Sequence, residues 1–174
     1  MRYLSKHRAL ESIRKLKESF RSLVLQNYEY RAKSCLTCGT PGACCLDAHF
    51  VNVHISRLEA IEIRLKIGTF SKQVQRDVYN RVERAINEYS LTSTGDTFAQ
   101  TFACPLFEPG TGCLVHGDAK PSACIAHACY ENKADLPPDT LLAEQEKQID
   151  DLNTRVFGSP QPWMPLPIAI RQND

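Results

Sequence analysis

The sequence predicts a mainly α-helical protein, with about five helices around an irregular, cysteine-rich metal site and a short β-hairpin. Several long stretches place apolar residues every three or four positions, which is the spacing of one face of a helix. One shorter stretch has two apolar arms around a turn of glycine and proline, as a hairpin does. The eight cysteines fall into two compact groups of four, which is typical of a fold built around bound metal.

The size and charge of the chain favour a single folded domain. Its 174 residues are enough to bury a core, and 43% hydrophobic and 24% charged residues are ordinary for a globular protein. The net charge of +1 is unevenly spread, because residues 1–34 carry nine Lys or Arg against three Asp or Glu. The expected organisation is a basic amphipathic helix at 1–34, a cysteine-cluster core at 35–130, and a C-terminal helix with a proline-rich tail at 131–174.

The chain is expected to be cytoplasmic and to have no membrane association. Its first residues contain no apolar run typical of a signal peptide, and no stretch is long and apolar enough to span a membrane. Thiols are kept reduced in the cytosol, so grouped cysteines there are expected to bind metal rather than to form disulfides.

The first predicted helix covers residues 6–30. Its apolar face repeats at steps of three and four residues and consists of Leu10, Ile13, Leu16, Phe20, Leu23 and Asn27. A short strand is expected at 50–55. The sequence Ser56-Arg-Leu-Glu59 then has the form of a capping box, and it opens a second helix that stops at Gly68.

A third helix is expected from Ser71 to Tyr89, where it serves as scaffold. The hairpin follows, with residues 102–107 and 113–116 as its arms. Pro121 fits the first turn of a helix that carries Cys124 and Cys129.

The last predicted helix spans residues 139–156 and ends at Gly158. The tail at 159–167 contains four prolines and is predicted to be irregular. It is expected either to wrap the surface, with Trp163 as an anchor, or to bind a protein partner.

All eight cysteines are candidate metal ligands. They are Cys35, Cys38, Cys44, Cys45, Cys104, Cys113, Cys124 and Cys129. A Cys-x-x-Cys loop aims two sulfurs at one point, and eight thiolates would need bound cations to balance their charge. Zinc and iron–sulfur clusters both suit sulfur ligands, and the spacing does not choose between them.

Three histidines near the cysteines are candidate additional ligands or hydrogen-bond partners of the sulfurs. His116 lies three residues after Cys113, and His127 lies between the last two cysteines of the chain. His49, which follows the adjacent cysteine pair, is the third candidate.

At these residues the chain resembles the bacterial cysteine-cluster family of zinc- or iron-chelating proteins with a Cys-x-x-Cys-x-x-Cys-Cys signature. The resemblance covers about residues 35–130 and rests on Cys35, Cys38, Cys44-Cys45, Cys104-Pro105-Leu106, Cys113-Leu114-Val115, Lys120-Pro121-Ser122-Ala123-Cys124 and Cys129. The gap between Cys38 and Cys44 is longer than in the signature. His116 replaces the usual tyrosine, and Lys120 replaces the usual arginine. Flagellin lysine N-methylases are similar at a greater distance, which implies an iron–sulfur centre and methyl transfer.

These observations leave three functional hypotheses. The first is a metal-binding protein whose zinc or iron–sulfur centre is structural or serves metal handling, with the first helix or the proline-rich tail available to a protein partner. The second is an enzyme of redox or methyl-transfer type at that centre. The third is nucleic-acid binding through the basic first helix, by Arg14, Lys15, Lys17 and Arg21.

Overall fold

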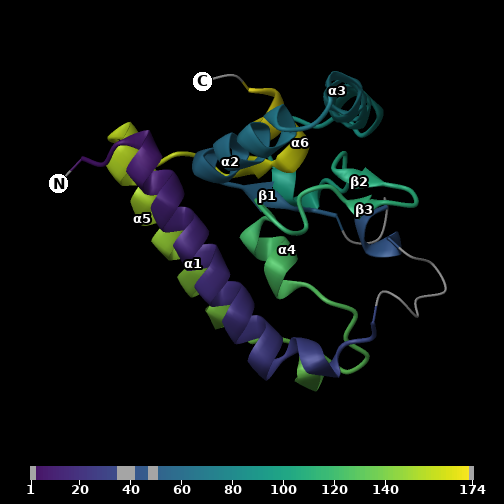
Figure 1. Cartoon of the computed structure of the whole chain (residues 1–174), viewed down its shortest axis with the longest axis vertical. Helices are drawn as coiled ribbons and strands as arrows, with labels where there is room; N and C mark the ends of the chain where they lie inside the picture. The colour runs from purple at the N-terminus through teal and green to yellow at the C-terminus, as the bar shows by residue number, and fades with distance from the viewer. Residues whose placement is uncertain (1–2, 35–41, 47–50, 173–174) are drawn as a thin grey trace. The chain divides into compact units, whose positions relative to one another are not determined.

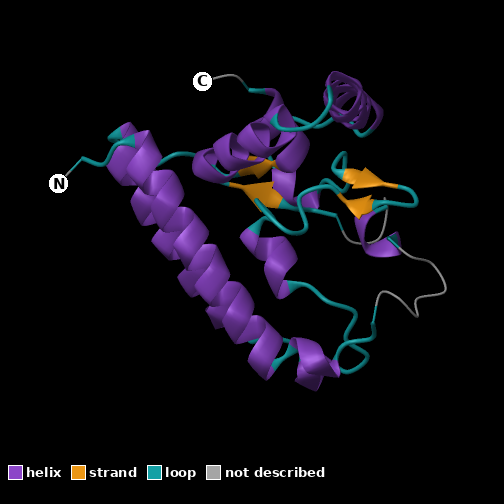
Figure 2. Cartoon of the chain, in the orientation of Figure 1, coloured by secondary structure: helices purple, strands orange, loops and turns teal. Residues whose placement is uncertain are grey.

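The structure is a computed structural model of the chain, and it describes residues 3–34, 42–46 and 51–172. It is mainly helical, with 58% helix and 6% strand, which confirms the predicted class (Figure 2). The chain folds into two compact units. The first unit comprises residues 1–41 and 120–161, and the second comprises residues 42–119 and 162–174.

The first unit is a pair of long helices, distant in the sequence, with a third, shorter helix packed against them. Its helices are α1 (Lys6–Asn27), α4 (Ser122–Ala126) and α5 (Asp139–Phe157). Figure 1 shows α1 and α5 running side by side, and α4 contacts both of them. Phe20 and Val24 of α1 pack with Ile125 of α4 in the small core of this unit.

Local signals explain where these helices begin and end. Ser5 caps the start of α1 by accepting a hydrogen bond from the N–H of Arg8, as serine does at many helix starts. Gly158 ends α5, as predicted from the sequence, and it does so in the left-handed conformation, with φ +80°. Beyond α1 the chain makes a short 3-10 turn at Glu29–Arg31.

The buried face of α1 differs from the predicted one. The residues that it buries are Ala9, Ile13, Lys17, Phe20 and Val24. Leu23 is 39% exposed, so only Ile13 and Phe20 of the predicted stripe are buried. The prediction was wrong because Lys17 was counted as a surface charge, although its long apolar stem can line a core.

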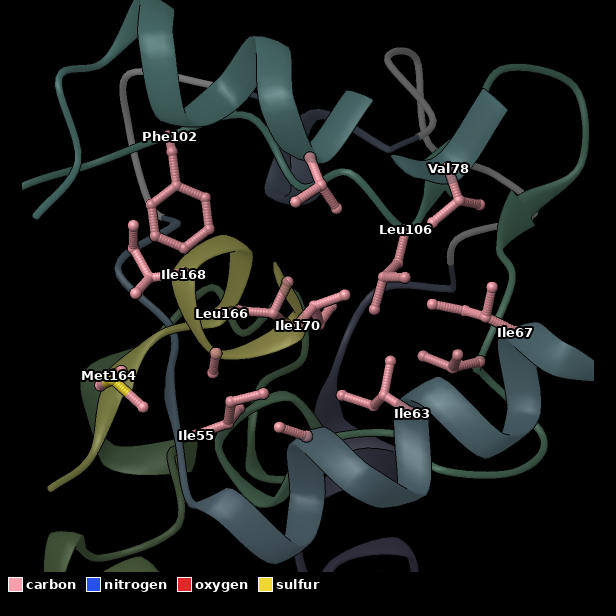
Figure 3. Close-up of a cluster of buried hydrophobic side chains, with 14 of the residues drawn as sticks. Ile55, Ile63, Ile67, Val78, Phe102, Leu106, Met164, Leu166, Ile168 and Ile170 are labelled. Carbon is pink, nitrogen blue, oxygen red and sulfur yellow. The ribbon is translucent and has the colours of Figure 1, made fainter. Parts of the chain in front are cut away.

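The second unit contains the larger core. Its helices are α2 (Arg57–Gly68), α3 (Lys72–Glu88) and α6 (Leu166–Arg171). Two antiparallel strand pairs complete it: β1 (His54–Ile55) with β4 (Met164–Pro165), and β2 (Phe107–Glu108) with β3 (Gly112–Cys113). Figure 3 shows its core, in which Ile63 and Ile67 of α2 face Leu106.

The capping box predicted at the start of α2 is confirmed. The side chain of Ser56 accepts from the N–H of Glu59, and the Glu59 carboxylate accepts from the N–H of Ser56 at 3.1 Å. The third predicted helix is confirmed as α3, which Ser71 caps through the N–H of Val74.

The C-terminal tail is irregular at 159–163, as predicted, but regular from Met164 on, so the prediction was wrong for residues 164–167. Met164 and Pro165 pair with β1, and the helix α6 follows directly. Pro167 lies in the first turn of α6, where a missing N–H breaks no intrahelical hydrogen bond. Leu166, Ile168 and Ile170 are almost completely buried, so this segment is part of the core.

Three further elements are shorter than predicted. Strand β1 covers only His54–Ile55 of the expected 50–55, and residues 47–50 lie outside the described ranges. The paired part of the hairpin is limited to Phe107–Glu108 and Gly112–Cys113. Helix α4 ends at Ala126, so it carries Cys124 but not Cys129. In the described ranges, none of the helices is long and apolar enough to cross a membrane.

Candidate metal centre

Four of the predicted ligands lie in the second unit, and the fold brings their two pairs together. Cys44 and Cys45 belong to a short 3-10 turn at Ala43–Cys45. The main-chain N–H of Cys104 donates to the carbonyl oxygen of Cys45 at 2.8 Å. This hydrogen bond joins two segments that are far apart in the sequence, and it places the adjacent cysteine pair beside the start of the hairpin.

The hairpin brings in the fourth thiol. Cys113 lies on β3 directly opposite Phe107 of β2. The N–H of Phe107 donates to the carbonyl of Cys104 at 3.1 Å, and this turn leads from Cys104 into β2. Cys104 and Cys113 are partly buried and pack against the core of the second unit. The scaffold of these two thiols is therefore fixed by main-chain bonds and core packing.

The pKa of the Cys45 thiol is affected by the other three thiols of the second unit. The pKa of Cys45 is raised from 9.0 to about 12. Burial is the largest cause, followed by the charges of Cys104, Cys44 and Cys113 and a hydrogen bond with the Cys44 side chain. The Cys45 thiol therefore keeps its proton at neutral pH unless a cation compensates the charge of its thiolate.

Arg81 of α3 contacts the same region. Its Nε donates to the carbonyl oxygen of Pro105, the residue after Cys104, at 2.8 Å. Its Nη2 atom is shielded from solvent and has no hydrogen-bond partner. A buried cationic N–H group without an acceptor is costly, so this guanidinium suits a site that becomes anionic when the thiols ionise.

The arrangement does not amount to a preformed metal cage. Among the residues that the structure describes, no three His, Cys, Asp or Glu side chains are arranged so that they could hold a metal ion. The chemistry of the donor set still fits, because four sulfurs are the ligands that zinc and iron–sulfur clusters take. Binding at these thiols would therefore require their side chains to turn toward a common point.

Two other predicted ligands lie in the first unit. Cys124 is on α4, and Cys129 follows that helix in an isolated bridge with Lys33, whose N–H donates to the Cys129 carbonyl at 2.9 Å. Cys35 and Cys38 lie outside the described residues. None of the six cysteines that the structure describes is in a disulfide.

The three candidate histidines differ in their surroundings and in whether the structure describes them. His116 is exposed, and its main-chain N–H donates to the carbonyl oxygen of Cys113 at 3.1 Å. His127 is also exposed, but the protein atoms around it and then the charge of Lys120 lower its pKa, which favours the neutral ring that binds metals. His49 lies outside the described residues.

Sequence reasoning missed Arg81 and misjudged Lys17. The third helix was expected to be scaffold, and nothing local distinguishes Arg81 from the other arginines of that helix. Lys17 was assigned to a basic, nucleic-acid-binding face, but it is 5% exposed. The predicted basic face of α1 therefore loses one of its four cations.

Comparison with known proteins adds no relative. No protein-family model matches the chain, and no curated protein or solved structure matches it. The resemblance to the cysteine-cluster family therefore stays a prediction from the cysteine pattern.

Proposed function

We propose that this chain is a metal-binding protein in which Cys44, Cys45, Cys104 and Cys113 of the second unit form one centre that holds zinc or an iron–sulfur cluster. The observation that carries the proposal is the meeting of two cysteine pairs from distant parts of the sequence, joined by the Cys104–Cys45 hydrogen bond of 2.8 Å. Four partly buried thiols in one place are unfavourable to ionise, because their negative charges repel one another. A bound cation would compensate this charge, so the gathering of the thiols favours a metal-binding role.

The bound group would act mainly as a cross-link. It would tie the turn at Ala43–Cys45 to the β2–β3 hairpin, and its binding free energy would add to the stability of the fold. Adjacent residues point in different directions, so Cys44 and Cys45 suit two metal atoms better than one tetrahedral ion. An iron–sulfur cluster or a pair of zinc ions satisfies this restriction, and a single zinc ion would use one of the two.

The other four predicted ligands would serve a second centre in the first unit. Lys33 pairs with Cys129, and Cys35 follows Lys33 two positions later in the sequence. This leaves Cys35 and Cys38 as predicted partners of Cys124 and Cys129, with His127 as an additional candidate ligand. A cytoplasmic location, a redox or methyl-transfer activity, and nucleic-acid binding stay predictions from the sequence.

The test is to purify the full chain anaerobically and to measure zinc, iron and acid-labile sulfide together with the absorption spectrum. Iron with sulfide and a brown colour would identify a cluster, and zinc without colour would identify zinc sites. A reduced, folded chain that binds neither metal when both are supplied would overturn the proposal.

The assignment of thiols to one centre has its own control. On a cadmium-loaded chain, each centre gives its own cadmium NMR signals. Cys104→Ser is expected to remove the signals of the second unit and to leave those of the first. Cys124→Ser is the matched control, and it is expected to do the opposite. Loss of all signals in both variants would contradict two separate centres.

A further inference from the structure

Gly42 begins the turn that presents the adjacent cysteines. Its carbonyl oxygen accepts hydrogen bonds from the N–H of Cys45 at 2.8 Å and from the N–H of Leu46 at 3.0 Å. Its φ of +84° lies in the left-handed region, which residues other than glycine adopt only with strain. The position of Cys44 and Cys45 therefore depends directly on the conformation of this glycine.

Phe107 occupies the space where a side chain at residue 42 would lie. A Cβ atom added to Gly42 would overlap the ring atoms of Phe107. Gly95, Gly110 and Gly112 also have positive φ, but a Cβ added to any of them meets nothing within 4 Å. The close approach of a ring is therefore particular to Gly42 among these four glycines.

The same phenylalanine is tied to the other two thiols. Its N–H donates to the carbonyl of Cys104 at 3.1 Å, and it pairs across the hairpin with Cys113. The contact between Gly42 and Phe107 thus connects the segment that carries one thiol pair to the segment that carries the other. It adds a side-chain contact to the single main-chain hydrogen bond from Cys104 to Cys45.

We propose that the contact between Gly42 and Phe107 is a positioning device that makes the four thiols of the second unit act as one binding site. The bare glycine lets the tip of the aromatic ring approach the backbone of the turn, and the ring fixes the distance between turn and hairpin. Without this contact the thiols would behave as two separate pairs of lower affinity. This inference rests on the proposed metal-binding function.

The test uses Co²⁺, whose thiolate complexes absorb in proportion to the number of bound sulfurs, on the reduced full chain. Gly42→Ala is expected to weaken Co²⁺ binding by about tenfold or more and to reduce the thiolate absorption. Gly95→Ala is the matched control, because Gly95 has φ +83° and open space around its Cβ position. It carries the same backbone strain without the overlap, so its affinity is expected to stay near that of the parent chain.

A double-mutant cycle isolates the contact. Phe107→Ala alone should also weaken Co²⁺ binding, because the ring no longer holds the turn. In the Phe107→Ala protein, Gly42→Ala is expected to weaken Co²⁺ binding no more than Gly95→Ala does, since the overlap is gone. Equal effects of Gly42→Ala with and without the ring would overturn the inference. If Gly42→Ala does not fold, the Co²⁺ affinities of Phe107→Leu and Phe107→Ala test the inference instead. Phe107→Ala is expected to lose more affinity than Phe107→Leu, because it removes more of the side chain that contacts Gly42.

The two proposals fail in different ways. A parent chain that binds no Co²⁺ through sulfur would refute the metal-binding function. The contact is then judged on the metal-free chain, by the alkylation rate of the half-buried Cys45 thiol. Gly42→Ala is expected to raise that rate several-fold over Gly95→Ala, and equal rates would refute the positioning role. A parent chain that binds Co²⁺ through its thiols, with an affinity and a spectrum that Gly42→Ala leaves unchanged, would refute the positioning role alone.

Discussion

The main-chain N–H of Cys104 donates a 2.8 Å hydrogen bond to the carbonyl oxygen of Cys45, and this bond joins the two halves of the candidate metal centre. Four half-buried thiols lie there, and the pKa of one of them, Cys45, is raised to about 12. Each property has a measurable consequence even before a metal is bound.

The raised pKa of Cys45 predicts that the metal-free chain loses stability in base. The folded thiol keeps its proton until about pH 12, whereas an unfolded thiol releases it near 9.0. The unfolded chain therefore binds fewer protons between these values, and the free energy of unfolding falls as the pH rises through them. Urea unfolding of the reduced, metal-free chain above about pH 9 should show this slope.

Cys45→Ser is the variant that tests the source of the slope. It removes the thiol with the raised pKa, so its stability should depend less on pH over the same range. Other groups also titrate in base, and the difference between the parent chain and the variant excludes them. Identical slopes in the two proteins would show that Cys45 is not the cause.

Arg81 predicts a second effect, on stability without metal. Its Nε satisfies the carbonyl of the buried Pro105, and Arg81→Ala would leave that oxygen without its donor. We expect a loss of about 1–3 kcal/mol in the free energy of unfolding. Arg84→Ala is the control, because Arg84 lies on the exposed face of the same helix. Urea unfolding of both variants checks the prediction, and equal losses would contradict it.

The helices show how far the sequence could predict this fold. The second helix was predicted because the Ser56–Glu59 capping box is a local signal, and α5 was predicted because Gly158 marks its end. Such signals lie within one turn of the residues that they affect. The buried face of α1 was misjudged because Lys17 looks like a surface residue until its neighbours are known.

The missed elements depend on partners that are distant in the sequence. Strand β4 exists because Met164 pairs with Ile55, and no local pattern within a proline-rich segment specifies that pairing. The candidate site has the same property. Cysteine spacing predicted that sulfurs would gather, but only the fold shows that Cys45 meets Cys104. The two groups of cysteines that are close in the sequence are therefore not the groups of cysteines that the two units contain.

The burial of α6 predicts that the tail is essential for stability. Ile170 is fully buried, and Ile170→Ala would leave a cavity in the core of the second unit. We expect a loss of about 2–5 kcal/mol. Leu65→Ala is the control, because Leu65 on α2 of the same unit is 51% exposed. A chemical denaturation midpoint that Ile170→Ala leaves unchanged would show that the tail is not part of the core.

His54 predicts a loss of stability in acid that is independent of the thiols. Its ring is buried, its Nε2 lies 2.9 Å from Oγ1 of Thr97, and it stacks on Phe98 with ring centres 4.0 Å apart. Burial lowers its pKa below 6.5, and the hydrogen bond to the Asn52 carbonyl only partly opposes this. The unfolded chain therefore takes up the proton first as the pH falls.

The sign of the effect follows from that order of protonation. The contribution of neutral His54 to stability is complete above the unfolded pKa, and it is lost as the pH falls through about 6.5 toward the lower folded value. His54→Gln should reduce stability at neutral pH and flatten its dependence on pH as the pH falls from neutral through 6.5. His7→Gln is the matched control, because the His7 side chain is 83% exposed. Urea unfolding across this range should show the full slope in His7→Gln, and the same slope in His54→Gln would contradict the assignment.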